Sequence, residues 1–252
     1  MTIIFVPYHL DERLPDHDFP LPDGHTVRTV TEQLPDGDVW ARLGHLYEPV
    51  AWQVAHCVQS GETPTVVSGD CTVSLGTMAG LQQAGVDAGI VWFDAHGDVQ
   101  TLETTASGYA GGMPLRILVG YRPELISQRL GLRPLAEDRA LLVDARDLDQ
   151  PEADYLATAA VRRCGVDDLD AAMLPPGPLV LHVDLDVIDA GELPDLRFPV
   201  SGGPTASAVV AAARRVLDTG RVAAVDIACT WHPGRLDPHG VRAGLLSALT
   251  AS

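Results

Sequence analysis

The sequence contains no lysine, so all 17 of its basic residues are arginines. The absence of lysine excludes any mechanism that needs a Schiff-base lysine or the lysine of a phosphate-binding P-loop. The 34 acidic residues outnumber the arginines and give the chain a formal net charge of −17. Nucleic acid and anionic membranes repel a chain with this charge, so we expect neither as a partner.

Cysteine is also scarce. The four cysteines, Cys57, Cys71, Cys164 and Cys229, are scattered without a CxxC spacing. Neither a disulfide framework nor a structural zinc site is therefore indicated. No signal peptide and no apolar run long enough to cross a bilayer are visible, since Thr2–Val6 is only long enough for a strand. We expect a cytoplasmic protein.

The 252 residues are 46% apolar and 5% aromatic, which suffices for one large core, and we expect a single domain over residues 1–252. Apolar runs of strand length alternate with segments of helical periodicity. This alternation predicts a three-layer α/β/α fold around a mainly parallel sheet of about eight strands. The expected strands are Thr2–Val6, Thr26–Val30, Thr65–Val67, Gly89–Phe93, Ala140–Val143, Val161–Val166, Leu179–Val183 and Ala223–Ala228. The expected helices are Asp38–Ser60, Thr72–Ala84, Met113–Leu132 with a break around Gly120, Pro151–Ala160, Pro204–Thr219 and Gly240–Leu249.

The stretch WFDAHGD places three ligand-type residues where an apolar run ends. Asp94, His96 and Asp98 alternate along the chain after Gly89–Phe93. Residues two apart on an extended backbone point the same way, so these side chains would converge. They would do so at the carboxyl end of a buried strand, where open parallel sheets keep their sites.

A second acidic cluster follows the run Pro178–Val183: Asp184 and Asp186, with Asp189 behind them. Either cluster alone is typical of turn residues or helix caps. Together, two such strand-terminal clusters would repel one another unless divalent cations lie between them. Carboxylates with one imidazole suit manganese or a similar ion, and their number favours two ions sharing a water.

Three stretches, SGDCTVSLG, DAHGD and HVDLDVID, resemble the arginase/agmatinase family of ureohydrolases, whose motifs are GGDHS, DAHxD and SxDxDxxDP. The resemblance runs from about Thr63 to Pro233. It implies an arginase-like fold and a manganese-dependent hydrolase, in which a metal-bound hydroxide attacks the carbon of a linear guanidino or amidino compound. It also implies a catalytic role for Asp98 beside its role as a ligand.

Cys71 is the first departure from the family, since it stands where GGDHS has its histidine ligand. It could coordinate as a thiolate, which would make the first metal site weak and pH-dependent. Alternatively it is a small buried hydrophobic residue at a helix start. The matching neighbours Gly69 and Asp70 favour coordination.

The resemblance also assigns a group of residues to the amino-acid head of a substrate. Gln100 and Ser107 fall where arginases hold the carboxylate, and Asp149 and Glu152 where they hold the α-amino group. A positive amine beside two carboxylates is favourable on electrostatic grounds alone. The alternative is that Asp149 caps the following helix and Glu152 is an acid of its first turn.

The residues for the guanidinium tail depart from the family. Gly111 replaces its proton-shuttling histidine, and Cys229 replaces the glutamate that binds guanidinium. A thiol is a poor substitute for a bidentate carboxylate. His232 could supply an acid or base near Cys229, or could be a surface histidine.

The branch that hydrolyses Nω-hydroxy-L-arginine resembles this chain more closely, because it shares the cysteine and a loop like Glu103–Met113. We therefore expect an arginine-like amino acid such as Nω-hydroxy-L-arginine as the substrate. The rival interpretation is a metal-binding relative without ureohydrolase activity that serves a structural or regulatory role. The oligomeric state stays open, with a homo-oligomer among the alternatives.

Overall fold

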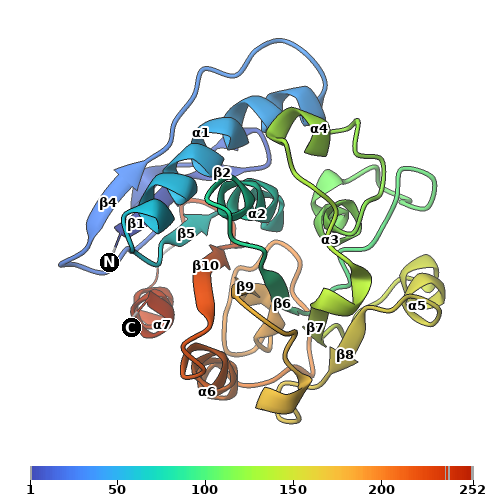
Figure 1. Cartoon of the computed structure of the whole chain (residues 1–252). Coiled ribbons are helices and arrows are strands. Elements are labelled where there is room, and N and C mark those ends of the chain that lie inside the picture. The colour runs from blue at the N-terminus through green and yellow to red at the C-terminus, as the bar shows by residue number, and fades with distance from the viewer. Residues whose placement is uncertain (1, 236, 238, 251–252) are drawn as a thin grey trace.

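The computed structural model describes residues 2–235, 237 and 239–250. Its centre is an eight-stranded sheet in which neighbouring strands run parallel (Figure 1). In spatial order the strands are β4 (Thr26–Thr29), β1 (Thr2–Val6), β5 (Thr65–Ser68), β10 (Val222–Ala228), β9 (Leu179–Asp184), β6 (Gly89–Asp94), β7 (Ala140–Asp144) and β8 (Arg162–Cys164). A short antiparallel pair, β2 (Tyr8–His9) and β3 (Glu12–Arg13), lies outside this sheet. The predicted parallel sheet is confirmed.

Helices cover both faces of the sheet and complete the three predicted layers (Figure 1). The helices of one face are α1 (Val39–Gln59), α2 (Ser74–Gln83), α3 (Pro114–Leu118) and α4 (Ser127–Leu130), and those of the other are α6 (Ala206–Leu217) and α7 (Val241–Thr250). Alternate residues of each strand face opposite layers. Ile4 therefore packs in the core of the first layer and Ile3 in the core of the second.

Several expected elements are shorter than the sequence indicated: the helix expected over Pro151–Ala160 ends at Leu156, and two other elements change more. The predicted helix Met113–Leu132 is two short helices, α3 and α4, because Gly120 between them has a φ of +107°, outside helical geometry. The predicted strand Val161–Val166 is reduced to β8 at the edge of the sheet, where it pairs only with β7. Short edge strands are common because they gain hydrogen bonds on one side only.

The strands that carry the acidic motifs lie in the middle of the sheet, where β6 pairs with β9, β9 with β10, and β10 with β5. Because all four are parallel, their carboxyl ends meet at one edge. The segments that follow Ser68, Asp94 and Asp184 are thereby brought together from distant parts of the chain. α5 (Gln150–Leu156), which connects β7 to β8, begins near the same edge.

Among the described residues, no helix combines the length and the apolar character that crossing a bilayer requires.

Candidate metal centre and substrate pocket

The turns that follow β6 and β9 are built in the same way. Asp94 is the last residue of β6, and Asp184 is the last residue of β9. Each carboxylate accepts the backbone N–H two residues later, that of His96 at 2.7 Å and that of Asp186 at 2.9 Å. These bonds hold each turn tight, so the second side chain of each motif stays beside the first.

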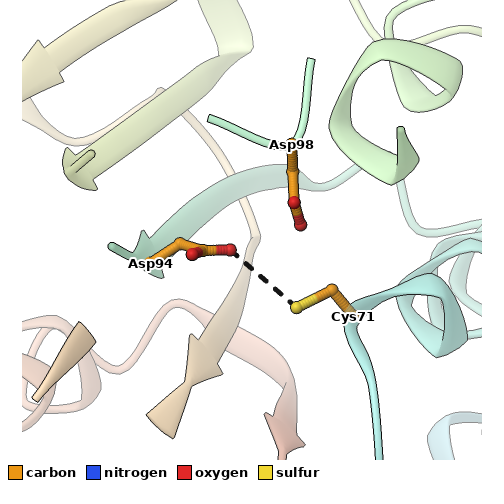
Figure 2. Close-up of side chains that lie close together, drawn as sticks. All are labelled: Cys71, Asp94 and Asp98. Carbon is orange, nitrogen blue, oxygen red and sulfur yellow. Dashed lines mark hydrogen bonds between the residues drawn. The ribbon is translucent and has the colours of Figure 1, made fainter. Parts of the chain in front are cut away.

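A first group of potential ligand atoms comes from Cys71, Asp94 and Asp98 (Figure 2), and all three atoms lie within 4.8 Å of one another. Cys71 begins the single helical turn that precedes α2. Its Sγ lies 3.9 Å from Asp94 Oδ2 and 2.8 Å from Asp184 Oδ2. The thiol therefore lies where it could contact a cation held by these carboxylates.

A second group comes from Asp94, His96 and Asp186. His96 Nδ1 lies 3.3 Å from Asp94 Oδ1 and 3.2 Å from Asp186 Oδ2. Asp94 belongs to both groups, so its carboxylate could bridge two ions, and Trp92 Nε1 orients it by donating to Oδ2 at 3.0 Å. Asp189 belongs to neither group, because its carboxylate accepts backbone N–H groups of its own loop.

Burial and mutual repulsion dominate the electrostatics of Asp98, Asp184 and Asp186, whereas for Asp94 the hydrogen bonds and charge of His96 outweigh burial and lower the pKa. Burial, followed by the charges of neighbouring carboxylates, raises the pKa of Asp98 and of Asp184 well above the usual range. Burial also raises the pKa of Asp186 to about 6. For His96 burial acts in the opposite direction, but its carboxylate partners outweigh burial and raise its pKa to about 12.

A pair of divalent cations fits this set of donors. Asp98 Oδ2 is buried, and no described residue hydrogen-bonds to it. Burial and the nearby acids raise the pKa of the Cys71 thiol, so coordination as a thiolate would need the charge of the cations. Carboxylate oxygens with one imidazole are ligands that manganese accepts.

The floor of a cavity of about 280 Å³ is formed by Asp184 and by four members of the two groups, Cys71, His96, Asp98 and Asp186. Its walls come from the loop Thr105–Gly112, the start of α5 and Phe198. Several carboxylates face it, while His96 is the one basic side chain among the described residues that line it. An acidic cavity of this kind attracts a cationic ligand.

The sequence profile of the arginase family matches residues 9–233. The chain belongs to the arginase family. Arginase-family homologues are hydrolases that act on C–N bonds of linear amidines, and binuclear metal dependence is a property of the family.

The relatives of known name include two bacterial arginases. The arginase of Bacillus subtilis (strain 168) is 29% identical over 212 residues, which cover 77% of this chain and 71% of that protein. The arginase of Bacillus caldovelox is 30% identical over 172 residues, which cover 63% of this chain and 58% of that protein. The chain thus matches less than two thirds of the latter relative's length.

Solved structures share the fold over nearly the whole chain. The native arginase of Bacillus caldovelox has a TM-score of 0.82 at 24% identity, covering 98% of this chain and 95% of the other. The formimidoylglutamase of Bacillus subtilis has a TM-score of 0.70 at 17% identity, covering 98% and 85%. Proteins named for different substrates therefore share this fold, and the fold alone does not select the substrate.

Three residues that the arginase pattern assigns to the amino-acid head line the cavity together. Gln100 Nε2 donates to Asp149 Oδ2 at 2.8 Å, and Gln100 Oε1 accepts from Thr104 Oγ1 at 2.8 Å. The Glu152 carboxylate accepts the N–H of Val99 at 3.2 Å and that of Asp149 at 3.1 Å. Asp149 is thus the N-cap residue of α5 and Glu152 an acid of its first turn, as the alternative interpretation held, and burial raises the pKa of Glu152.

Ser107, the fourth of these residues, lies on the exposed part of the loop at the cavity mouth. Its Oγ accepts the N–H of Tyr109 at 3.2 Å. The loop is closed at its base by a bond of 2.9 Å from Gln100 N to Gly112 O.

The structure does not bring Cys229 or His232 to the cavity. Cys229 is fully buried in the apolar core under α6 and α7, where burial raises its pKa. His232 is exposed and lies outside the cavity lining. Thr230 is the residue beyond β10 that lines the cavity, and its Oγ1 donates to Asp184 Oδ1 at 2.6 Å. The match to the arginase motif had selected Cys229, the residue before Thr230, whose side chain faces the layer of α6 and α7.

Sequence reasoning also missed a pair of side chains beside Gly111. Tyr109 lines the cavity, and its Oη lies 3.2 Å from Nε2 of the buried His9. A Cβ added to Gly111 would lie 2.3 Å from the Tyr109 ring. The space beside Gly111 is thus occupied by Tyr109. No motif could have revealed the pair, because 100 residues separate its members.

Proposed function

We propose that this chain is a manganese-dependent ureohydrolase that cleaves a linear C–N bond of a guanidino or amidino compound. The observation that carries the proposal is the position of Asp94, which belongs to both groups of ligand atoms, because the other members of these groups line an acidic cavity. Two cations bound there would generate a nucleophile from water at neutral pH. The proposed ligands are Cys71, Asp94, His96, Asp98, Asp184 and Asp186.

Asp98 is the residue best placed to assist the attack. Its Oδ2 has no hydrogen-bond partner among the described residues and lies at the cavity floor. It could therefore accept the proton that the attacking water gives up. Burial and the neighbouring carboxylates raise its pKa, which strengthens it as a base whenever it is ionised.

The charge of the cavity favours a substrate with two positive groups. A guanidinium or amidinium carbon would lie over the floor, and an α-amino group would lie beside Asp149 and Glu152 at the start of α5. Gln100 holds Asp149 in place, and Ser107 could donate to the carboxylate of an amino-acid head. These contacts support an L-amino acid rather than a plain amine.

The part of the cavity that would meet the guanidinium end of the substrate differs from the arginase pattern. Cys229 lies in the core, and Thr230 from the same strand end brings a hydroxyl group instead of a carboxylate. Among the described residues, this strand end therefore offers no carboxylate that could accept two hydrogen bonds from plain guanidinium. We propose a substrate with a modified tail, such as Nω-hydroxy-L-arginine.

A panel of substrates tests the proposed activity. The manganese-loaded protein would be given L-arginine, Nω-hydroxy-L-arginine, agmatine and 4-guanidinobutyrate, and release of urea or hydroxyurea would be measured. We expect turnover of Nω-hydroxy-L-arginine above that of the other compounds. Silence across the panel with manganese fully bound would instead support a metal-binding relative that has lost ureohydrolase activity.

A variant of Asp149 tests the assignment of the amino-acid head. Losing one charge-assisted hydrogen bond should weaken binding by about 1.5–3 kcal/mol, which is tenfold or more in KM at about 1.4 kcal/mol per factor of ten. Asp149→Ala should therefore raise KM for amino-acid substrates without changing manganese content. The matched control is Asp154→Ala, an exposed position on the same helix. Agmatine turned over as well as L-arginine would show that the head is not read here.

A further inference from the structure

One aromatic side chain of the cavity is left uncovered. Four large apolar side chains are exposed among the described residues, and Phe198, which is 41% exposed, is the one of them that lines the cavity. An apolar side chain gains free energy when a ligand removes it from water. An uncovered ring inside a concave site therefore indicates a contact for the ligand.

The backbone is fixed on both sides of Phe198. Arg197 N donates to the carbonyl oxygen of Thr230 at 2.7 Å. On the other side, the carbonyl oxygen of Val200 accepts from Arg146 Nη2 at 2.8 Å. Phe198 therefore follows a residue that is bonded to Thr230, and it lies at the strand end that offers no carboxylate to a guanidinium group.

Two other rings of the cavity pack against Phe198. The ring centroid of Tyr109 lies 5.0 Å away at an interplanar angle of 47°, and that of His96 lies 6.3 Å away at 85°. Both distances lie within the range of attractive aromatic pairs. His96 belongs to the second group of potential ligand atoms, so Phe198 stands beside the proposed metal pair.

An aromatic ring at this place can bind the kind of group that the missing carboxylate would have bound. The face of a phenyl ring carries partial negative charge from its quadrupole and attracts a cation. Guanidinium suits such a face, because it is planar, delocalised and weakly hydrated. At the end of β10, Phe198 thus offers a stacking surface where Thr230 offers only a hydroxyl group.

A ring and a carboxylate place different demands on the guanidinium end of a substrate. A carboxylate that accepts two parallel hydrogen bonds needs a free N–H facing it on each of two nitrogens. A ring contacts the plane of the cation and uses none of these N–H groups. A hydroxyl or methyl group on a terminal nitrogen therefore obstructs a carboxylate partner but leaves stacking on a ring intact.

We propose that Phe198 determines which guanidino groups the cavity accepts. Its ring stacks on the planar cation in place of the missing carboxylate and tolerates a substituent on a terminal nitrogen. The substrate class is then an L-amino acid whose guanidinium is hydroxylated or alkylated on that nitrogen. This inference rests on the proposed function, since the cation must lie over the floor beside His96.

The test compares a charged with an uncharged ligand of nearly the same shape. L-citrulline has the head of L-arginine but a neutral ureido group in place of guanidinium. In manganese-loaded Phe198→Leu, KM for L-arginine and Nω-methyl-L-arginine should rise about 2- to 30-fold. This range is equivalent to about 0.5–2 kcal/mol for a cation–π contact, at about 1.4 kcal/mol per factor of ten. The inhibition constant of L-citrulline should stay at the wild-type value, and Phe198→Tyr, which keeps a ring, should match wild type with all three compounds.

Substituted compounds test the second half of the proposal. In the wild-type protein, KM for Nω-methyl-L-arginine should lie within about tenfold of KM for L-arginine, because losing one charge-assisted hydrogen bond would cost about tenfold or more. The matched control is Leu102→Ala, which removes an apolar side chain of similar exposure outside the cavity. It should leave every constant unchanged.

Three results would overturn the role of Phe198. They are an unchanged KM for L-arginine in Phe198→Leu, an equal loss for L-citrulline, which would reveal apolar packing alone, and rejection of the methylated compound by the wild-type protein. If no compound is hydrolysed, calorimetric Kd values of the same ligands replace KM. Absence of turnover then counts against the hydrolase function, while the Kd values still decide the role of Phe198.

Discussion

Replacing Asp98 by asparagine should have opposite effects on stability in the metal-free and the metal-loaded protein. The Asp98 side chain is almost fully buried, and its Oδ2 has no described hydrogen-bond partner. The residue adopts a φ of 52°, in the left-handed region that asparagine also tolerates. Asp98→Asn therefore removes a charge without adding backbone strain, which makes it a cleaner change than alanine.

The sign of the effect follows from the pKa of Asp98. Burial and the nearby Asp94 and Asp184 raise this pKa in the folded protein. The folded state then binds the proton more tightly than the unfolded state. The corresponding stability is fully present below the unfolded pKa of about 3.9 and is lost as the pH rises through the folded pKa. At pH 8 the metal-free protein should thus be strained by an ionised carboxylate, and at pH 4 it should not.

The expected gain comes from the cost of a buried polar group without a partner, about 1–3 kcal/mol and more for a charge. Metal-free Asp98→Asn should therefore melt higher than wild type at pH 8, by about 2–4 °C for each kcal/mol in a chain of this size. At pH 4 the two proteins should melt at similar temperatures. Asp167→Asn, at an exposed position far along the chain, is the control.

Manganese should reverse the order. A ligand at 100 times its Kd stabilises the folded state by about 2.7 kcal/mol, and the variant lacks one proposed carboxylate ligand. Calorimetric melting curves with chelator and with manganese, at pH 4 and pH 8, supply the four comparisons. A metal-free variant less stable than wild type at pH 8, or an undiminished manganese shift, would refute the reasoning.

Three further predictions concern the floor and the wall of the cavity. After dialysis, Asp94→Asn should lose manganese from both sites and Asp186→Asn mainly from one, because only Asp94 belongs to both ligand groups. The measurement is the amount of manganese per chain, and equal losses in the two variants would show that Asp94 does not bridge. Cobalt-loaded protein should show a sulfur-to-cobalt absorption band that disappears in Cys71→Ser, and a band retained in the variant would exclude the thiolate as its source. Gly111→Ala should lower kcat in the wild-type background by displacing the Tyr109 ring, but not in Tyr109→Ala, where the clash is absent.

Much of the fold could be predicted from the sequence because local patterns and tertiary packing agree. The spacing of Leu43, Leu46, Val50 and Val54 predicted one long helix, and these residues are all buried on one side of α1. The segment around Gly120 was harder, since its apolar residues also fit a continuous helix. A backbone angle that only glycine adopts readily decided the outcome there.

The floor of the site could be predicted because strand alternation fixes where side chains point. Asp94 and Asp184 end paired parallel strands, so two short motifs distant in sequence had to meet. The tail wall could not be predicted in this way. Beyond β10 a shift of one residue exchanges the two faces of the sheet, and the motif match selected Cys229 where the cavity receives Thr230.

The acidic floor of the cavity and its wall at Tyr109 also differ in the contacts that fix their side chains. The carboxylates of Asp94 and Asp184 are held by backbone N–H groups of their own motifs, and these bonds do not involve the side chain of Cys71. The wall depends on a contact between the β2–β3 pair and a loop 100 residues later, with Gly111 leaving the space that the Tyr109 ring fills. A substitution at such a wall can change the space that a substrate meets there while the residues that would hold the cations stay where they are. The departures from the arginase pattern at Gly111 and Cys229 would therefore alter the tail that the cavity accepts without removing the hydrolytic chemistry of its floor.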